Sequence, residues 1–488
     1  MSTRAVLPVR KNQEPLTGWP ALWRRAGMAL PVVFFALYTA SSLLRDHHLG
    51  TAGYDLGIFD QAVQSYAHLD APMTPLKGPG FNLLGDHFSP ILALLAPLYR
   101  IWPDRRLLLV AQALLLAVSV VPVVGVTARK LGHWAGFAVG VAYGLSWGIQ
   151  GMVGYDFHEV AFAIPLLAFA MAALAENRYR AVAVWALPLL LVKEDMGLTV
   201  AAIGLVLVLR RQWRLGAGLT VAGIGTFLLT TLVIIPHLDH LFHTYRYWSV
   251  VGSAKSNTAP APGIGQLLRL LVDLPRDAVT PTGKLTMLLW LFGIVAFVVF
   301  RSPLLLVAVP TLLWRLVSTN PAYWSIGQVH YNAVLMPIVF VAFADAVASL
   351  RSGRWRLLRG CGRIAVPVVL AVALLALPRF SLWDLTRAAT YRADPHAAAA
   401  RALAGRIPSG AEVSASNYLV PVVVDRCVTV LFPNVHRVPV DYVLVDTTNL
   451  YGVPLPHDQQ EAYLIALPGQ GYHLIGQADG IELFQRDR

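Results

Sequence analysis

Charged residues are scarce in this 488-residue chain, where they make up 14% of the sequence, while hydrophobic residues make up 56%. A soluble globular chain carries about 25% charged residues, so this deficit argues against an ordinary soluble enzyme and indicates a membrane protein. The apolar runs are continuous and helical in length rather than alternating, which favours helices that cross the membrane.

Cysteines and the common nucleotide and hydrolase motifs are also lacking. The two cysteines, Cys361 and Cys427, have no metal-ligand spacing and imply no disulfide framework. No Gly-rich phosphate loop, GxSxG elbow or HExxH motif occurs, so nucleotide chemistry on the cytoplasmic side is not expected. The net charge of +12 comes from arginines in short loops between apolar runs, which membrane topology explains without a nucleic-acid partner.

The apolar runs predict eleven membrane spans and place the basic loops "ARK", "NRYR", "RRQWR" and "RSGRWRLLRGCGR" together on the cytoplasmic face. Residues 1–25 are then a cytoplasmic tail, and 26–377 form the transmembrane domain of a multi-pass inner (plasma) membrane protein, with outer loops 45–106 and 236–284. Within the first outer loop, 88–102 is predicted to be an interfacial or re-entrant helix. The predicted spans are 26–44, 107–127, 134–150, 160–175, 181–192, 196–209, 215–235, 285–300, 304–317, 332–350 and 364–377.

The composition changes from about Pro378 onward. "EVSAS", "CVTVLF", "DYVLVD", "YHLIGQ" and "IELFQR" are typical of short strands, and "PHAAAARALAGR" and "HDQQEAYLIAL" of helices. Residues 378–488 are therefore predicted to form a small soluble α/β domain on the extracytoplasmic face. The predicted fold class is an all-α polytopic membrane domain followed by this domain.

Polar and ionisable residues gather at the outer ends of the spans and in the outer loops, in five separate stretches. Ionisable groups at membrane depth are costly and are usually functional, so we expect these side chains to meet in one substrate site at the lipid–water boundary. The predicted site residues are Tyr54, Asp55, Asp60, Asp86, His87, Asp156, His158, Glu159, Lys193, Glu194, Asp195, His330 and Tyr331.

Simpler interpretations exist for several of these residues. Asp60 is equally well explained as a solvated or helix-capping carboxylate, and Lys193 as a hairpin-tip lysine paired with an acid. The "HLDHLFH" segment offers His237, Asp239, His240 and His243 at near-helical spacing, which suits either a metal site or surface histidines, the more ordinary account.

Four motifs carry a family resemblance: "YDLGIFDQ", "GDHFSPILALLAPLY", "KED" and "IPSGAEVSAS". Together they resemble a family of bacterial polytopic membrane proteins of unknown function, over about residues 27–488. That family in turn is similar to the GT-C superfamily of membrane glycosyltransferases, which use polyprenyl-phosphate sugars.

The resemblance implies a role for particular positions of this chain. Asp55 matches the catalytic carboxylate of the first outer loop, with Leu56 where relatives carry a second acid. Lys193 takes the place of a lysine near the lipid phosphate, but Glu194 follows it where glycine would. His330 replaces the arginine of an Arg-Tyr-x-x-Pro segment, and the match of the His87 segment to a His-Pro-Pro motif is looser.

The implied function is transfer of a sugar, hexosyl or pentosyl, from a polyprenyl-phosphate donor to a glycan or lipid acceptor of the bacterial cell envelope or wall. Asp55 would be the general base, and Lys193 with His330 or a divalent cation would meet the phosphate. Asp156 and Glu159 would bind sugar hydroxyls or metal. The competing interpretations are a lipid-linked-sugar transporter or flippase and a non-catalytic envelope assembly protein. A transporter often shows internal repeats and a midplane site, and neither is visible in the sequence.

Overall fold

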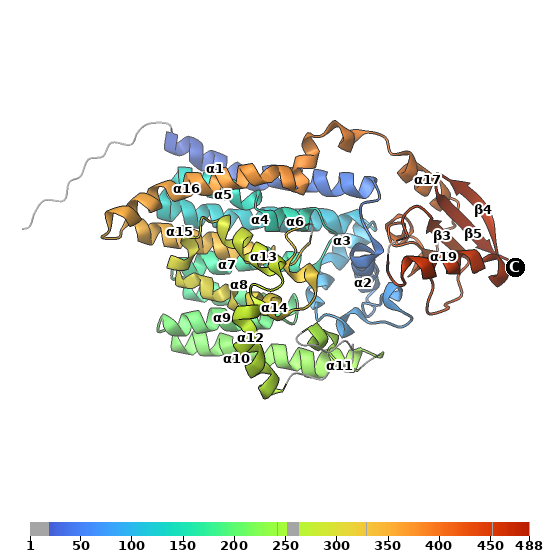
Figure 1. Cartoon of the computed structure of the whole chain (residues 1–488), viewed down its shortest axis with the longest axis horizontal. Helices are drawn as coiled ribbons and strands as arrows, with labels where there is room; N and C mark the ends of the chain where they lie inside the picture. The colour runs from blue at the N-terminus through green and yellow to red at the C-terminus, as the bar shows by residue number, and fades with distance from the viewer. Residues whose placement is uncertain (1–18, 242, 251–262, 328, 451, 488) are drawn as a thin grey trace, which may run out of the picture.

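The computed structural model describes residues 19–241, 243–250, 263–327, 329–450 and 452–487, so most of the predicted N-terminal tail and part of the second outer loop lie outside the described residues. The chain forms an elongated helical body with a small sheet domain at one end (Figure 1). The helices of the body are α1 Trp19–His47, α2 Ile58–Ala67, α3 Ala96–Ile101, α4 Arg106–Leu131, α5 His133–Gly144, α6 Trp147–Val153, α7 Ala163–Ala175, α8 Tyr179–Ala186, α9 Met196–Leu209, α10 Trp213–Leu229, α11 Ile235–Leu238, α12 Ile264–Asp277, α13 Thr282–Gly293, α14 Val309–Val317, α15 Leu335–Arg351 and α16 Arg356–Ala376.

Four helical segments of the described chain are long and apolar enough to cross a membrane: Ala21–His47, Arg106–Leu131, Trp213–Leu238 and Arg356–Arg379. The predicted count of eleven spans is therefore not confirmed. Several predicted spans are broken: 134–150 divides into α5 and α6, and 181–192 changes from α8 to a 3₁₀ segment, Leu187–Leu191, that contains Pro188. Others are short, since the 14 residues of α9 rise only about 21 Å, less than the roughly 30 Å hydrocarbon core.

The predicted elements of the C-terminal region are confirmed. They are α17 Pro395–Ala404, β1 Glu412–Ala415, β2 Val428–Leu431, β3 Tyr442–Asp446, α19 His457–Ala466, β4 Tyr472–Ala478 and β5 Ile481–Arg486. A short helix that was not predicted, α18 Val420–Val423, lies between β1 and β2. The sheet has the order β2-β1-β3-β5-β4, with β1 parallel to β2 and β3. β5 runs antiparallel to both β3 and β4. The carboxyl end of β1 leads directly into a loop that contacts the helical body.

The first outer loop fills the junction between the two parts. A π-helical turn, Gly53–Gly57, leads into α2, and 3₁₀ turns at Leu83–Gly85 and Pro90–Leu95 precede α3. The region 88–102 is thus helical in two short pieces, consistent with the predicted interfacial helix. Because Leu56, Phe59 and Val63 are buried at helical spacing, this loop packs onto the body.

Candidate functional site

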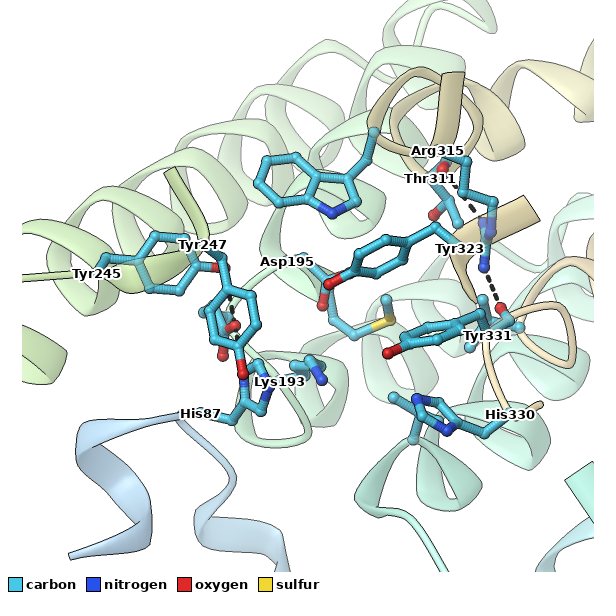
Figure 2. A pocket seen from close by; sticks show the side chains of 15 residues that line it. His87, Lys193, Asp195, Tyr245, Tyr247, Thr311, Arg315, Tyr323, His330 and Tyr331 are labelled. Carbon is cyan, nitrogen blue, oxygen red and sulfur yellow. Dashed lines mark hydrogen bonds and ion pairs between the residues drawn. The ribbon is translucent and has the colours of Figure 1, made fainter. Parts of the chain in front are cut away.

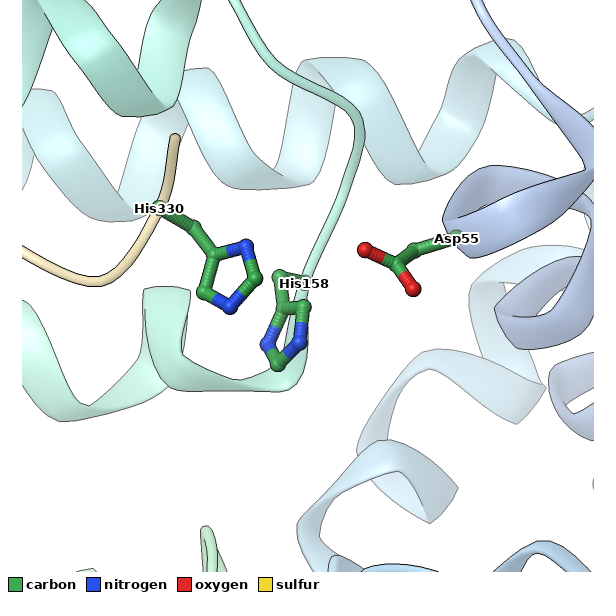
Figure 3. Close-up of side chains that lie close together, drawn as sticks. All are labelled: Asp55, His158 and His330. Carbon is green, nitrogen blue, oxygen red and sulfur yellow. The ribbon is translucent and has the colours of Figure 1, made fainter. Parts of the chain in front are cut away.

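Asp55, His158 and His330 come together although they lie in three distant parts of the chain (Figure 3). One side-chain donor atom from each lies within 4.8 Å of the others. The rings of His158 and His330 stack with centroids 3.5 Å apart and an interplanar angle of 21°. Both histidines are buried, whereas Asp55 is half-buried, so the carboxylate lies at the solvent side of the pair.

The donor types of this cluster suit a divalent cation, but the ring orientation does not. One carboxylate and two imidazoles are common ligands, and Glu159 beside Nδ1 of His158 is the kind of outer carboxylate that orients a ligating histidine. Imidazole lone pairs, however, lie in the ring planes. Two rings stacked in parallel cannot both aim at one ion, so His330 would have to rotate first. As it stands, the cluster is a polar contact pair facing Asp55.

His330 has unused hydrogen-bonding capacity. Neither of its ring nitrogens has a hydrogen-bond partner among the described residues. Burial, then the neighbouring His158 and the Lys193 ammonium, hold the pKa of His330 well below its ordinary value. A neutral imidazole with two free nitrogens can both accept and donate, which suits contact with a hydroxyl or a phosphate oxygen.

Glu159 joins the histidine pair to Lys193. Its side chain is fully buried, with Oε2 2.7 Å from Nδ1 of His158 and Oε1 2.9 Å from Nζ of Lys193. The expected pairing of Lys193 with an acid is therefore present, but with Glu159 rather than with the adjacent Glu194. An ammonium has three donors, so this contact leaves two for a further anion.

Glu194 instead holds the first outer loop in place. Its carboxylate accepts hydrogen bonds from the Tyr245 hydroxyl (2.9 Å) and the Phe88 N–H (3.0 Å), and lies 2.8 Å from Nδ1 of His87. These partners account for the acid at the position where the resemblance leads one to expect glycine. The carboxylate is fully occupied by its own partners and does not form an ion pair with Lys193.

A pocket of about 50 Å³ lies beside this network (Figure 2). That volume suits a phosphate-sized group rather than a whole lipid-linked sugar. Lys193 and Arg315 bring positive charge to it, and Asp195 brings a carboxylate oxygen without a partner in the described chain. Burial is the largest cause that raises the pKa of Asp195 to about 6. The lining of the pocket includes His87, Lys193, Glu194, Asp195, Tyr245, Tyr247, Thr311, Trp314, Arg315, Tyr323, His330 and Tyr331.

His87 lines the pocket, and the neighbouring Asp86 lies in contact with Tyr247. The Tyr247 hydroxyl donates to Asp86 at 3.2 Å, and the Tyr247 ring stacks on His87 at 4.5 Å between centroids. Burial would raise the pKa of Asp86, but Lys77, which pairs with it, and His87 hold that pKa below its ordinary range. Asp86 is therefore a charged anchor for Lys77 and Tyr247.

Three further predicted site residues belong neither to the pocket lining nor to the Asp55–His158–His330 cluster. Asp156 lies 2.5 Å from the Arg45 guanidinium and accepts the Ala52 N–H at 2.8 Å, so it supports the chain just before Asp55. Asp60 is fully buried and accepts the Tyr99 hydroxyl at 3.1 Å. The Tyr54 side chain lines a separate small pocket beside Leu76.

The histidines of the "HLDHLFH" segment are surface residues. His237, His240 and His243 are all exposed, and the described residues form no metal-ligand group there. Asp239 is buried and lies 3.3 Å from Nε of Arg246. The more ordinary account of this segment is therefore the one that fits.

The predicted site residues leave out several residues that line the pocket, among them Tyr245, Tyr247, Tyr323 and Arg315. Arg315 is buried and donates to the Thr311 carbonyl at 3.2 Å and to the Tyr331 carbonyl. Its signal was available, because a lone arginine interrupts the apolar run 304–317 and an ionisable residue within such a run is functional by default. Tyr245 lies in a loop and Tyr247 and Tyr323 in short 3₁₀ segments, where no periodic pattern marks them.

Asp60 gives a testable pH dependence. Burial is the main cause that raises its pKa to about 8, whereas an unfolded chain has an aspartate pKa of about 3.9. Between these values the folded protein keeps a proton that the unfolded chain has lost, so stability falls as the pH rises from about 4 to 8. Asp60→Asn removes this loss. We expect its melting temperature at pH 8 to exceed that of the wild type by roughly 3–5 °C, with a smaller difference at pH 5. An equal difference in melting temperature between the two proteins at pH 5 and at pH 8 would contradict this.

The fold is similar to that of a solved protein, ArnT. The crystal structure of ArnT from Cupriavidus metallidurans bound to undecaprenyl phosphate matches with a TM-score of 0.52 and 13% identity, covering 96% of this chain and 98% of ArnT. The apo form of that ArnT (TM-score 0.48, 12% identity, 95% and 98% covered) and an Archaeoglobus fulgidus oligosaccharyltransferase complex with Zn and sulfate (0.42, 11%, 92% and 73%) are less similar. At such identities the likeness establishes the fold alone.

The chain belongs to the DUF2079 family of predicted membrane proteins, whose model matches residues 45–483. No curated protein matches the sequence. The family membership and the fold together confirm the predicted resemblance to polytopic membrane proteins of the GT-C type.

Proposed function

We propose that this protein is an integral membrane glycosyltransferase that moves a sugar from a polyprenyl-phosphate donor to an extracytoplasmic acceptor of the cell envelope. The observation that carries the proposal is that His330 belongs both to a cluster with a carboxylate and to a pocket with two cations. Asp55 lies beside His158 and His330, and His330 also lines the pocket that holds Lys193 and Arg315. ArnT, which shares the fold, is bound to undecaprenyl phosphate in its crystal structure.

In the proposed reaction the pocket residues bind the leaving phosphate, and Asp55 accepts the proton of the acceptor. The leaving phosphate gains charge, and Lys193, Arg315 and the neutral His330 supply donors for it. The sugar would lie against His330, between the phosphate and Asp55. Asp55 would then take the proton of the acceptor hydroxyl as that oxygen attacks the anomeric carbon of the sugar. The bond between the anomeric carbon and the phosphate oxygen breaks at the same time, and polyprenyl phosphate leaves.

The membrane orientation belongs to the same proposal. The site would open at the outer lipid–water boundary of the inner membrane, with the N-terminus cytoplasmic and the region 378–488 extracytoplasmic. A membrane enzyme suits this reaction because the polyprenyl chain needs an apolar environment while the sugar phosphate needs the polar pocket.

The direct test is turnover of the purified protein in lipid vesicles with a panel of polyprenyl-phosphate sugars and envelope glycans as acceptors. We expect release of polyprenyl phosphate from at least one donor, and only when an acceptor is present. Movement of intact donor across the bilayer without release would contradict the proposal and favour a flippase. Repeating the assay with EDTA separates two sources of positive charge: lost turnover that Mn²⁺ restores would show that the reaction needs a cation, and unchanged turnover would leave the phosphate to Lys193 and Arg315.

A further inference from the structure

The turn that carries Asp55 is bound by the C-terminal domain rather than by the helical body alone. The Gly53 N–H donates to the backbone carbonyl of Asn417 at 2.7 Å, and the next N–H, of Tyr54, donates to the Asn417 side-chain Oδ1 at 3.0 Å. Two successive backbone donors just before Asp55 thus end on one residue that is 363 positions from Tyr54 in the sequence. Asn417 is 3% exposed, so water does not compete for these bonds.

The packing around these bonds leaves little freedom. A Cβ on Gly53 would lie 2.9 Å from Val420, and one on Gly57 would lie 2.8 Å from the same side chain. Both glycines of the "GYDLG" turn therefore let the backbone approach α18 more closely than any other residue would allow. Further along, Nε2 of Gln61 donates to the Thr429 carbonyl at 2.8 Å, which extends the same interface along α2.

The opposite side of the turn is held by the helical body. Oδ2 of Asp156 accepts the Ala52 N–H at 2.8 Å, and Arg45 holds the other oxygen of Asp156. The backbone before Asp55 is therefore hydrogen-bonded both to Asp156 of the helical body and to Asn417 of the C-terminal domain. The Asp55 carboxylate itself points toward His158 (Figure 3).

Asn417 is in turn held by the sheet. It follows β1 after Ser416, whose N–H donates to the Leu444 carbonyl at 3.0 Å and whose hydroxyl accepts the Asp446 N–H at 3.1 Å. The loop that grips the Asp55 turn is thus part of the sheet's hydrogen-bonded frame, and a shift of the domain would move Asp55.

We infer that Asn417 is a positioning residue for Asp55 and that the C-terminal domain is a structural part of the active site. This inference rests on the proposed function. Because a misplacement of about 1 Å in a reacting group can cost about 100-fold in rate, loss of the Asn417 side-chain acceptor should act on turnover more than on donor binding.

The test compares Asn417→Ala with Asn417→Asp, which keeps an oxygen at the Oδ1 position in either protonation state. We expect Asn417→Ala to lower kcat about 10- to 100-fold with KM for the polyprenyl-phosphate donor changed less than about threefold, and Asn417→Asp to recover most of the loss. Arg401→Ala is the matched control, because Arg401 donates to the His47 carbonyl at 2.8 Å across the same interface but away from Asp55.

Wild-type turnover with an unchanged kcat for Asn417→Ala would overturn the inference and leave the proposed function intact. An equal loss for Arg401→Ala would also overturn it, because general docking would then be the cause. Hydrogen exchange supplies a readout that needs no substrate: the Tyr54 amide, which loses its side-chain acceptor, should exchange faster in Asn417→Ala than in the wild type or in Arg401→Ala. The Gly53 amide keeps its backbone acceptor in this variant. Unchanged exchange at the Tyr54 amide would overturn the inference even if no donor is turned over.

Discussion

Asp55→Asn is expected to lower sugar transfer by about 10²–10⁴-fold, the range that a positioned general base contributes. The amide keeps the shape of the side chain and its contact with the His158–His330 pair, but it cannot accept a proton from the acceptor hydroxyl. Binding of polyprenyl phosphate should be nearly unchanged, since Asp55 is not among the residues that line the cationic pocket. The measurement is kcat for donor consumption together with the affinity for undecaprenyl phosphate.

Asp70→Asn is the matched control for this prediction. Asp70 lies in the same outer loop, just after α2, and is exposed, so the substitution changes the loop charge in the same way without touching the site. Turnover of Asp70→Asn should equal that of the wild type. If Asp55→Asn keeps more than about a tenth of wild-type turnover, Asp55 is not the base, and Asp195, whose oxygen faces the pocket, becomes the next carboxylate to test.

Local patterns in the sequence were sufficient for the C-terminal domain but not for the span count. The segment "DYVLVD" is short and rich in valine, and it forms β3 within a residue of the predicted bounds. The hydropathy pattern, in contrast, does not indicate where a buried helix ends and the next one begins. The run 134–150 is apolar throughout, yet its helix ends at Gly144 and restarts at Trp147. Such breaks depend on packing inside the body, where Gly144 closely contacts the Phe34 ring.

The predicted site combines residues of two kinds. The first kind could be expected to meet, because ionisable groups near the membrane are costly to expose to lipid and therefore pair with one another. These residues are His158, Glu159, Lys193 and His330. The role of the two "GYDLG" glycines could not be predicted, because each leaves room for the Val420 side chain, which lies more than 350 residues further along the chain. Asp156 was also assigned by type alone, and only the structure shows that its two oxygens are occupied by Arg45 and Ala52.

Lys193→Met is expected to lower the affinity for undecaprenyl phosphate by about 100-fold or more, since it removes a pocket cation with two donors to spare. It should also destabilise the protein by about 3–5 kcal/mol, because Glu159 keeps a fully buried charge with only His158 as its partner. A loss of binding in this variant alone could therefore be a folding defect.

The double variant Lys193→Met/Glu159→Gln separates the two effects. Removing the orphaned charge should restore most of the melting temperature, whereas phosphate affinity should stay low because no ammonium remains. Glu159→Gln alone should change affinity in the opposite direction: with its carboxylate gone, the Lys193 ammonium that lies 2.9 Å away is no longer neutralised, so undecaprenyl phosphate should bind more tightly than to the wild type. Recovery of phosphate affinity in the double variant would show that Lys193 serves the fold and not the phosphate, because the buried pair would then be the whole of its role.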